Sequence, residues 1–232
     1  MKIPGNLKAK LGNKFPFLAD FLLNFRFLLM KDQSQFGETG LLQEFIVDDE
    51  KVTSYYLELG SGHPITYSNS WNLPRTWIGI HVDPNQSLTR LWKIFRRRDI
   101  FIPNAITTDE NIRELEYFKF PRRHSVLNSV VPEFLENWKT LGISPVSLKV
   151  KAITLESCLE LNGINPASVS LVMCDIEGFD KQLISHMLDV AVIRPKWILV
   201  EDFNSEIESL LTERNFEILG TAGPTKLFKK II

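Results

Sequence analysis

Three short segments carry residue types that could bind a nucleoside, and the first begins at Glu58. An acid followed by Gly60-Ser61-Gly62 permits a tight turn and a close approach of the backbone to a ligand. The third glycine of the dinucleotide fingerprint is missing, because Ile65 stands at its position. A diphosphate would therefore be poorly held, whereas a nucleoside with an amino acid part that needs hydrogen bonds would fit. The alternative is a simple glycine turn between a strand and a helix.

The second segment is centred on Asp83, which follows an apolar run and precedes Pro84. An acid at the end of the second strand of a nucleotide-binding sheet can accept both hydroxyls of a ribose, about 20 residues after the glycine turn. Aspartate also favours the N-cap position of a helix, here one that begins near Asn85. The two roles are compatible.

The third segment is Asp175-Ile176-Glu177-Gly178, directly after another apolar run. A reaction at a hydroxyl group benefits from a general base, and Asp175 is our first candidate, followed by Glu177. His63 and His124 are further candidates, although a lone histidine is more often structural. The alternative for both acids is helix capping.

A metal site is a secondary interpretation of the same region, and our main expectation is a site without a metal. Asp175, Glu201 and Asn204 each follow a predicted strand and could converge. Their oxygen atoms would suit Mg²⁺ or Ca²⁺. Acids and amides at strand ends also cap helices, which is the competing explanation.

These segments follow apolar runs that predict the strands of an α/β fold. The runs are short, rich in β-branched or aromatic residues, and closed by Gly, Pro, Asp or Asn; they cover residues 55–59, 77–82, 99–106, 169–174, 196–200, 216–219 and 226–229. Helical periodicity appears at 86–97, 155–161 and 179–188. Alternation of strands and helices favours a doubly wound, mostly parallel sheet with helices on both faces. In such sheets ligands bind at the carboxyl ends of the strands, so the three segments should meet there.

Residues 1–53 are predicted to form an N-terminal helical extension that serves as a lid or brace. Apolar side chains recur there at helical spacing: Leu18, Phe21, Leu22, Phe25 and Leu28. The helix could pack on the main domain or, being basic and amphipathic, attach to a membrane surface or a partner. Its apolar run is interrupted by polar residues, so we expect neither a signal peptide nor a transmembrane segment.

Residues 54–232 are predicted to form the ligand-binding domain, with an insertion at 109–151. Insertions of this length are often functional. A basic cluster at 119–124 could attract a phosphate or carboxylate of a substrate, or could form a solvated loop face.

Composition limits the partners and the compartment. The 232 residues carry a formal net charge of −1, which gives no general attraction to nucleic acid. The two cysteines, Cys158 and Cys174, lie in apolar surroundings and match no zinc pattern. They fit packing roles in a reducing compartment, and we therefore expect a cytoplasmic protein.

Taken together, five segments resemble the FkbM-type methyltransferases, which use S-adenosylmethionine. They occur in the family's order: Ser34–Glu38, Leu57–Pro64, Ser68–Ser70, Trp77–Asn85 and Asp175–Asp180. The chain differs at Asp83, where the family often has Glu, and at Ser61, where it often has Ala. The insertion at 109–151 matches poorly, so the acceptor cannot be transferred from the family.

The resemblance implies a Rossmann-like fold of the class I methyltransferase type and a role for each matching residue. Gly60, Ser61 and Gly62 would approach the methionine part of the cofactor, and Asp83 would bind the ribose. Adenine would lie near Asn104 and Ala105, and Asp175 near the sulfonium. The remaining residues implied to contact the cofactor are Gln35, Glu58 and Pro84.

The expected function is therefore transfer of a methyl group from S-adenosylmethionine to a hydroxyl of a small molecule or carbohydrate. Two alternatives remain from other classes. One is a dinucleotide-dependent oxidoreductase, against which the missing third glycine argues. The other is a non-catalytic nucleoside-binding module that retains the fold.

Overall fold

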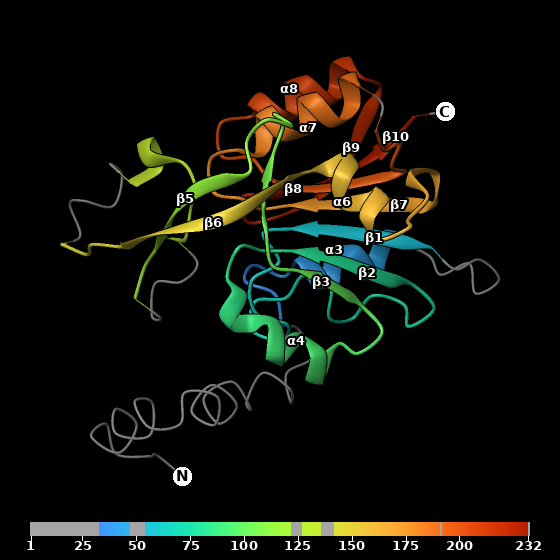
Figure 1. Ribbon diagram of the computed structural model, residues 1–232. Helices are drawn as coiled ribbons and strands as arrows, with labels where there is room; N and C mark the ends of the chain where they lie inside the picture. Colours follow the sequence, from blue (N-terminus) through green and yellow to red (C-terminus); the bar gives the residue numbers. More distant parts are fainter. Residues whose placement is uncertain (1–32, 47–53, 122–126, 136–141, 191, 232) are drawn as a thin grey trace, which may run out of the picture.

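The computed structural model describes residues 33–46, 54–121, 127–135, 142–190 and 192–231 (Figure 1). Within the first 53 residues it therefore describes only a short segment and helix α3 (Glu38–Phe45). The helix predicted from Leu18 to Leu28 lies outside the described residues.

A mixed but mostly parallel seven-stranded sheet forms the centre of the fold, with the order β3-β2-β1-β7-β8-β10-β9. Its five parallel strands are β1 (Tyr55–Leu59), β2 (Ile78–Val82), β3 (Ile100–Ile102), β7 (Val169–Cys174) and β8 (Trp197–Glu201). The last two strands, β9 (Phe216–Ala222) and β10 (Thr225–Lys230), form a hairpin whose β10 pairs antiparallel with β8. The direction of strand order reverses between β1 and β7. The predicted α/β class with a mostly parallel sheet is confirmed.

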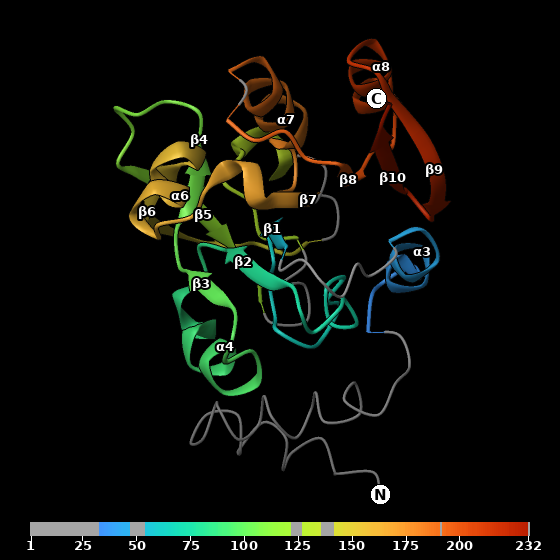
Figure 2. The ribbon, with the colours of Figure 1, turned by 90° about the vertical axis from the view of Figure 1, so that its right-hand side faces the viewer.

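Helices cover both faces of this sheet, as Figure 2 shows. One face packs against α6 (Leu155–Leu161), α7 (Asp180–Asp189) and α8 (Glu206–Glu213). The other face packs against α3 and α4 (Thr89–Phe95), which follows the short 3₁₀ turn η2 (Gln86–Leu88). Because both faces are covered, the central strands are apolar along nearly their whole length instead of alternating.

A second sheet stands beside the first, with the order β4-β6-β5. Its strands are β4 (Ala105–Thr107), β5 (Glu114–Lys119) and β6 (Val146–Thr154). The run 99–106, predicted as one strand, is therefore two, since Pro103 cannot donate a ladder hydrogen bond and the chain turns there into the second sheet. Figure 1 shows β5 and the first half of β6 extending past the ends of β1 and β7.

The predicted insertion thus contributes ordered structure. Its described part holds β5, most of β6 and the 3₁₀ turn η4 (Pro132–Leu135), which lies between these strands. Another short 3₁₀ turn, η5 (Pro166–Ser168), leads into β7. Across the described parts of the chain, no helix has the length and apolar character needed to cross a bilayer.

Candidate functional site

The three chemistry-bearing loops meet at the carboxyl edge of the central sheet, where the strand order reverses. The amide of Gly60 donates to the carbonyl of Val82 at 2.9 Å, at the end of β2. The amide of Asp175 donates to the carbonyl of Leu59 at 3.0 Å, at the end of β1. These contacts join the loops that follow β1, β2 and β7, as expected for the binding edge of an open α/β sheet.

Gly60 brings the first and third loops into direct contact. Its φ is +78°, which a residue with a side chain rarely adopts. A Cβ atom at this position would overlap the carbonyl oxygen of Asp175 and lie 2.7 Å from its carbonyl carbon. The glycine is therefore needed both for the turn and for the close packing of the two loops.

Asp83 ties the second loop to the glycine turn. Its Oδ2 accepts from the Gly62 amide at 2.9 Å, and its Oδ1 accepts from the Asn85 amide at 2.7 Å. Burial raises the pKa of this carboxyl, while the two amides and Lys119 oppose that rise. Each carboxylate oxygen has two lone pairs, so each keeps capacity to accept one hydrogen bond from a ligand. The loop-stabilising role is present, and the ribose role stays a prediction.

Three carboxylates form an acidic cluster beside these loops. One oxygen from each of Asp175, Glu177 and Glu201 lies within 4.8 Å of the others. Desolvation in the concave site, followed by repulsion from Asp180 and Glu201, raises the pKa of Asp175 well above its usual range, although its side chain keeps solvent access. Desolvation and the neighbouring acids likewise raise the pKa of Glu177 to about 9 and that of Glu201 to about 7. The cluster therefore favours protons or cations.

The turn that carries Glu177 is held by two side chains. Glu177 itself has a φ of +51°, in the left-handed region that is costly for residues other than glycine. Asp180, at the start of α7, accepts from the amide of Ile176 at 3.0 Å. From the second sheet's side, the hydroxyl of Ser129 donates to the carbonyl of Glu177 at 2.8 Å. These contacts hold the turn in the conformation that brings the Glu177 carboxyl close to Glu201.

A cavity of about 30 Å³ lies among these loops, with room for about one water molecule. Glu58, Ser61, Asp175 and Glu201 line it together with Tyr67 and other residues of the strand ends. The hydroxyl of Ser61 is buried and has no hydrogen-bond partner among the residues described. Sites for small molecules are typically about 300 Å³ or larger, so a nucleoside would need this crevice to open or would lie across its mouth.

Several predicted site residues serve the local structure instead. The Nδ1 atom of His63 accepts from the amides of Ile65 and Thr66 at 3.2 and 3.0 Å, and burial lowers its pKa to about 4. Asn204 accepts from the Glu206 amide at 3.3 Å, so its side chain contacts the start of α8. Glu177 takes the place predicted for Asn204 in the acidic cluster. Among the described residues, Asp175, Glu177 and Glu201 form the group that could hold a divalent cation.

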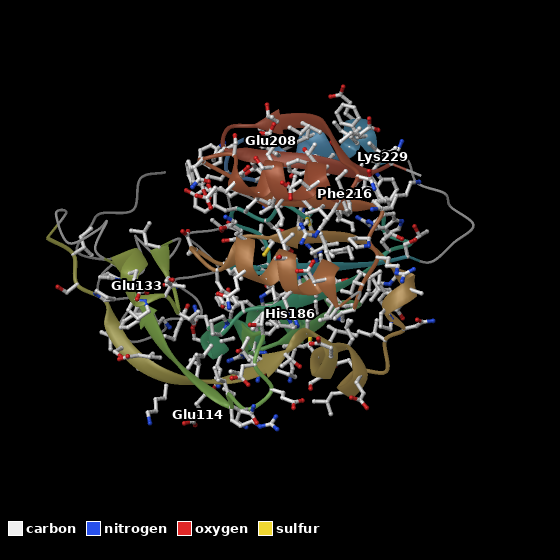
Figure 3. The ribbon with its side chains drawn as sticks, turned by 90° about the horizontal axis from the view of Figure 1, so that it is seen from above. Glu114, Glu133, His186, Glu208, Phe216 and Lys229 are labelled. Atoms are coloured by element: carbon white, nitrogen blue, oxygen red, sulfur yellow. The ribbon has the colours of Figure 1, made fainter. Side chains whose placement is uncertain are left out.

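The remaining candidates are placed as follows. Gln35 is exposed just before α3, and Pro84 is half-buried beside Asp83. Ala105 is buried in β4, whereas Asn104 lines an open groove of about 790 Å³ between the second sheet and α6. His124 lies outside the described residues. His186 was not a candidate; it lies on α7, in the helical layer (Figure 3). Its Nε2 atom is 3.1 Å from Oε1 of Glu156 on α6.

Four residues support the site through contacts that were not predicted, although Lys119 belongs to the predicted basic cluster at 119–124. Trp92 of α4 donates from Nε1 to the carbonyl of Gly62 at 3.1 Å, and Lys119 of β5 donates to the Asn85 side chain at 2.9 Å. Glu38 of α3 accepts from the Thr225 hydroxyl at 3.1 Å, and Ser129 holds the Glu177 turn. All four contacts join segments distant in sequence, so a local pattern could not have found them. For Glu38, its place in the segment Ser34–Glu38 was the only signal.

The chain matches no protein-family model and no curated protein.

Proposed function

We propose that the protein is an S-adenosylmethionine-dependent methyltransferase that acts on a hydroxyl group of a small molecule or carbohydrate. The observation that carries this proposal is the hydrogen-bonded contact between the Gly60-Ser61-Gly62 turn and Asp83, at the edge of the sheet where the strand order reverses. A tight glycine turn is held there by a strand-end carboxylate that keeps free acceptor capacity.

The sheet supports this assignment. When its five parallel strands are numbered by their order in the chain, so that β7 is the fourth and β8 the fifth, they lie side by side in the order 3-2-1-4-5. This is the order of doubly wound nucleotide-binding sheets. Helices on both faces agree with that architecture. Both features favour a Rossmann-like fold of the class I methyltransferase type.

The donor and acceptor groups favour an adenosyl ligand over a dinucleotide. Asp83 offers acceptors for ribose hydroxyls, while Glu58 and Ser61 line the neighbouring cavity, where an amino acid part would lie. The acidic cluster attracts a cation, and the sulfonium of S-adenosylmethionine is one. A turn with only two glycines is poorly suited to a diphosphate.

In the proposed reaction, the acceptor oxygen forms a bond to the methyl carbon as the carbon–sulfur bond breaks. The bound cofactor supplies a methyl group activated by positive sulfur, and the bonding pair stays on sulfur as a neutral thioether. The hydroxyl proton passes to a carboxylate that is ionised in the complex, with Asp175 as first candidate and Glu177 as second. The raised pKa of each group makes its ionised form a stronger base. The main work of these residues is alignment and proton acceptance in a crevice that must open to admit the ligand.

Calorimetry with S-adenosylmethionine and with its demethylated product, S-adenosylhomocysteine, tests the proposal. We expect binding of both, and a loss of about 100-fold in affinity for Asp83→Ala, because buried acceptors for two ribose hydroxyls are removed. Asp109→Ala is the matched control, since Asp109 is an exposed acid that also accepts from the amide two residues later, at 2.8 Å. Folded protein that binds neither compound, but binds reduced nicotinamide dinucleotide in a fluorescence titration, would replace this proposal with the oxidoreductase alternative.

A further inference from the structure

A chain of ionisable side chains in close contact extends from Arg96 to Glu58, which lines the cavity. His81 of β2 is fully buried, and its Nδ1 atom lies 2.8 Å from Oε2 of Glu58, in β1. Its Nε2 atom lies 3.3 Å from Oδ2 of Asp99, before β3. Asp99 in turn accepts from Nε of Arg96 at 2.7 Å. The Arg96 guanidinium is thus connected through Asp99 and His81 to the Glu58 carboxylate.

The ring of His81 has no space to turn away from this position. The Trp92 ring packs on it with centroids 4.0 Å apart, and the Tyr56 ring meets it edge-on at 5.4 Å. Gly79, its neighbour on the same strand face, has no side chain, and a Cβ there would overlap both His81 and the Tyr56 hydroxyl. The glycine therefore makes room for the histidine, which indicates that this arrangement is specified by the sequence.

The contacts of Glu58 leave one of its oxygens for a ligand. Within the described structure, both side-chain partners of this carboxylate meet Oε2: His81, in a close contact that is not aligned as a hydrogen bond, and the Ser70 hydroxyl at 2.7 Å. Glu58 is among the residues that line the cavity, together with Ser61 and Asp175, and it is only 5% exposed. A carboxylate so nearly buried is costly unless it is paired or hydrogen-bonded. The Ser70 hydroxyl donates to it, and the Arg96 guanidinium interacts with it electrostatically.

We propose that His81 is a positioning residue that holds Glu58 so that Oε1 receives a cationic group of the ligand in the cavity. The inference rests on the proposed function, under which that group is the α-ammonium of S-adenosylmethionine. His81 restricts the rotamers of Glu58 before the ligand arrives, so less conformational entropy is lost on binding. Trp92 couples the same ring to the glycine turn through its hydrogen bond to Gly62.

Two ligands separate this role from a general effect on the fold. S-adenosylhomocysteine carries the ammonium group, whereas 5′-methylthioadenosine has the nucleoside and thioether but no amino acid part. We expect Glu58→Gln and His81→Gln to weaken binding of the first by about 10- to 100-fold, as for a lost charge-assisted hydrogen bond. Affinity for the second should change by less than about threefold. His186→Gln, on the outer helical layer, is the matched control and should change neither.

The outcomes are distinguishable. A wild-type protein that binds neither ligand overturns the proposed function together with this inference. Wild-type binding of both, with His81→Gln weakening both equally or neither, overturns the inference alone. If circular dichroism shows His81→Gln to be unfolded, Asp99→Asn takes its place, because it removes the charge behind the ring with little change in volume. Selective loss of S-adenosylhomocysteine then supports the inference, and an equal or absent effect on the two ligands overturns it.

Discussion

Gly60 and the carbonyl group of Asp175 are so close that a Cβ atom on the glycine would overlap the carbonyl oxygen. This contact fixes the separation between the loops after β1 and β7, on either side of the point where strand order reverses. Both loops also carry groups that face the cavity. The spacing of the site therefore depends on backbone packing before any ligand binds.

Gly60→Ala is expected to destabilise the protein more than the backbone conformation alone requires. A left-handed conformation costs a non-glycine residue about 1–2 kcal/mol, and the overlap with backbone atoms adds strain that a flexible side chain cannot relieve. Gly163→Ala is the control, because Gly163 has a φ of +65° and open space where its Cβ atom would lie. Urea unfolding should show a loss for Gly60→Ala larger by at least about 2 kcal/mol. Equal losses of unfolding free energy in the two variants would mean that the loops after β1 and β7 can move apart without a loss of stability.

The histidine at position 63 should make stability depend on pH in a defined window. Burial lowers its pKa from 6.5 to about 4, so the folded state favours the neutral ring. As the pH falls, the unfolded chain binds a proton at His63 before the folded chain does. The contribution of the neutral ring to the free energy of unfolding is therefore complete above pH 6.5 and is lost as the pH falls through 6.5 toward 4. Urea unfolding of His63→Gln should show a flatter dependence in that window, by up to about 1.4 kcal/mol per pH unit. The same slope in the variant and the wild type would contradict the assignment.

Desolvation of Glu177, together with repulsion within the acidic cluster, predicts that one conservative change stabilises the fold. The pKa of Glu177 rises to about 9 from an ordinary 4.5, so its ionised form is disfavoured on folding. The contribution of protonated Glu177 to the free energy of unfolding is complete below pH 4.5 and is lost as the pH rises through 9. Glu177→Gln should therefore exceed the wild type in stability at about pH 8 by about 1–2 kcal/mol and match it near pH 4.5.

Thermal and urea unfolding at the two pH values measure this difference. Glu160→Gln, an exposed position on α6, controls for the loss of a negative charge as such. A variant that is less stable than the wild type at the higher pH would show that the Glu177 carboxylate is compensated by a partner or a bound cation.

The strands nearest the site could be predicted from the sequence because burial on both faces leaves a clear signal. The runs 55–59 and 169–174 agree with β1 and β7 to the residue, and each ends where a glycine or an acid follows. The run 99–106 was wrong as a single strand, because apolar character continues across Pro103 although pairing does not. β5 and β6 were missed, since one side of the second sheet is exposed and its strands mix charged with apolar residues.

The candidate site was predictable to the level of loops and not of contacts. Strand-end positions of Gly60, Asp83 and Asp175 follow from the alternation of elements and the known binding edge of such sheets. The convergence of Glu177 with Glu201 depends on the left-handed conformation of Glu177, which no sequence pattern specifies for glutamate. The same limit applies to Asn204, whose side chain turns toward α8 instead of the cluster.

Asp175→Asn separates catalysis from binding under the proposed function. The amide keeps the volume of the side chain and relieves repulsion within the cluster, so the fold and the affinity for S-adenosylhomocysteine should stay within about threefold of the wild type. Loss of the proton acceptor should lower the rate of methyl transfer by about 10²- to 10⁴-fold. Single-turnover transfer of a labelled methyl group to a panel of hydroxyl acceptors measures the rate. Because Glu177 lies beside Asp175 and is the second candidate base, Glu177→Gln serves as the comparison: a larger loss there would exchange the two roles, and full activity in both variants would remove the cluster from the reaction.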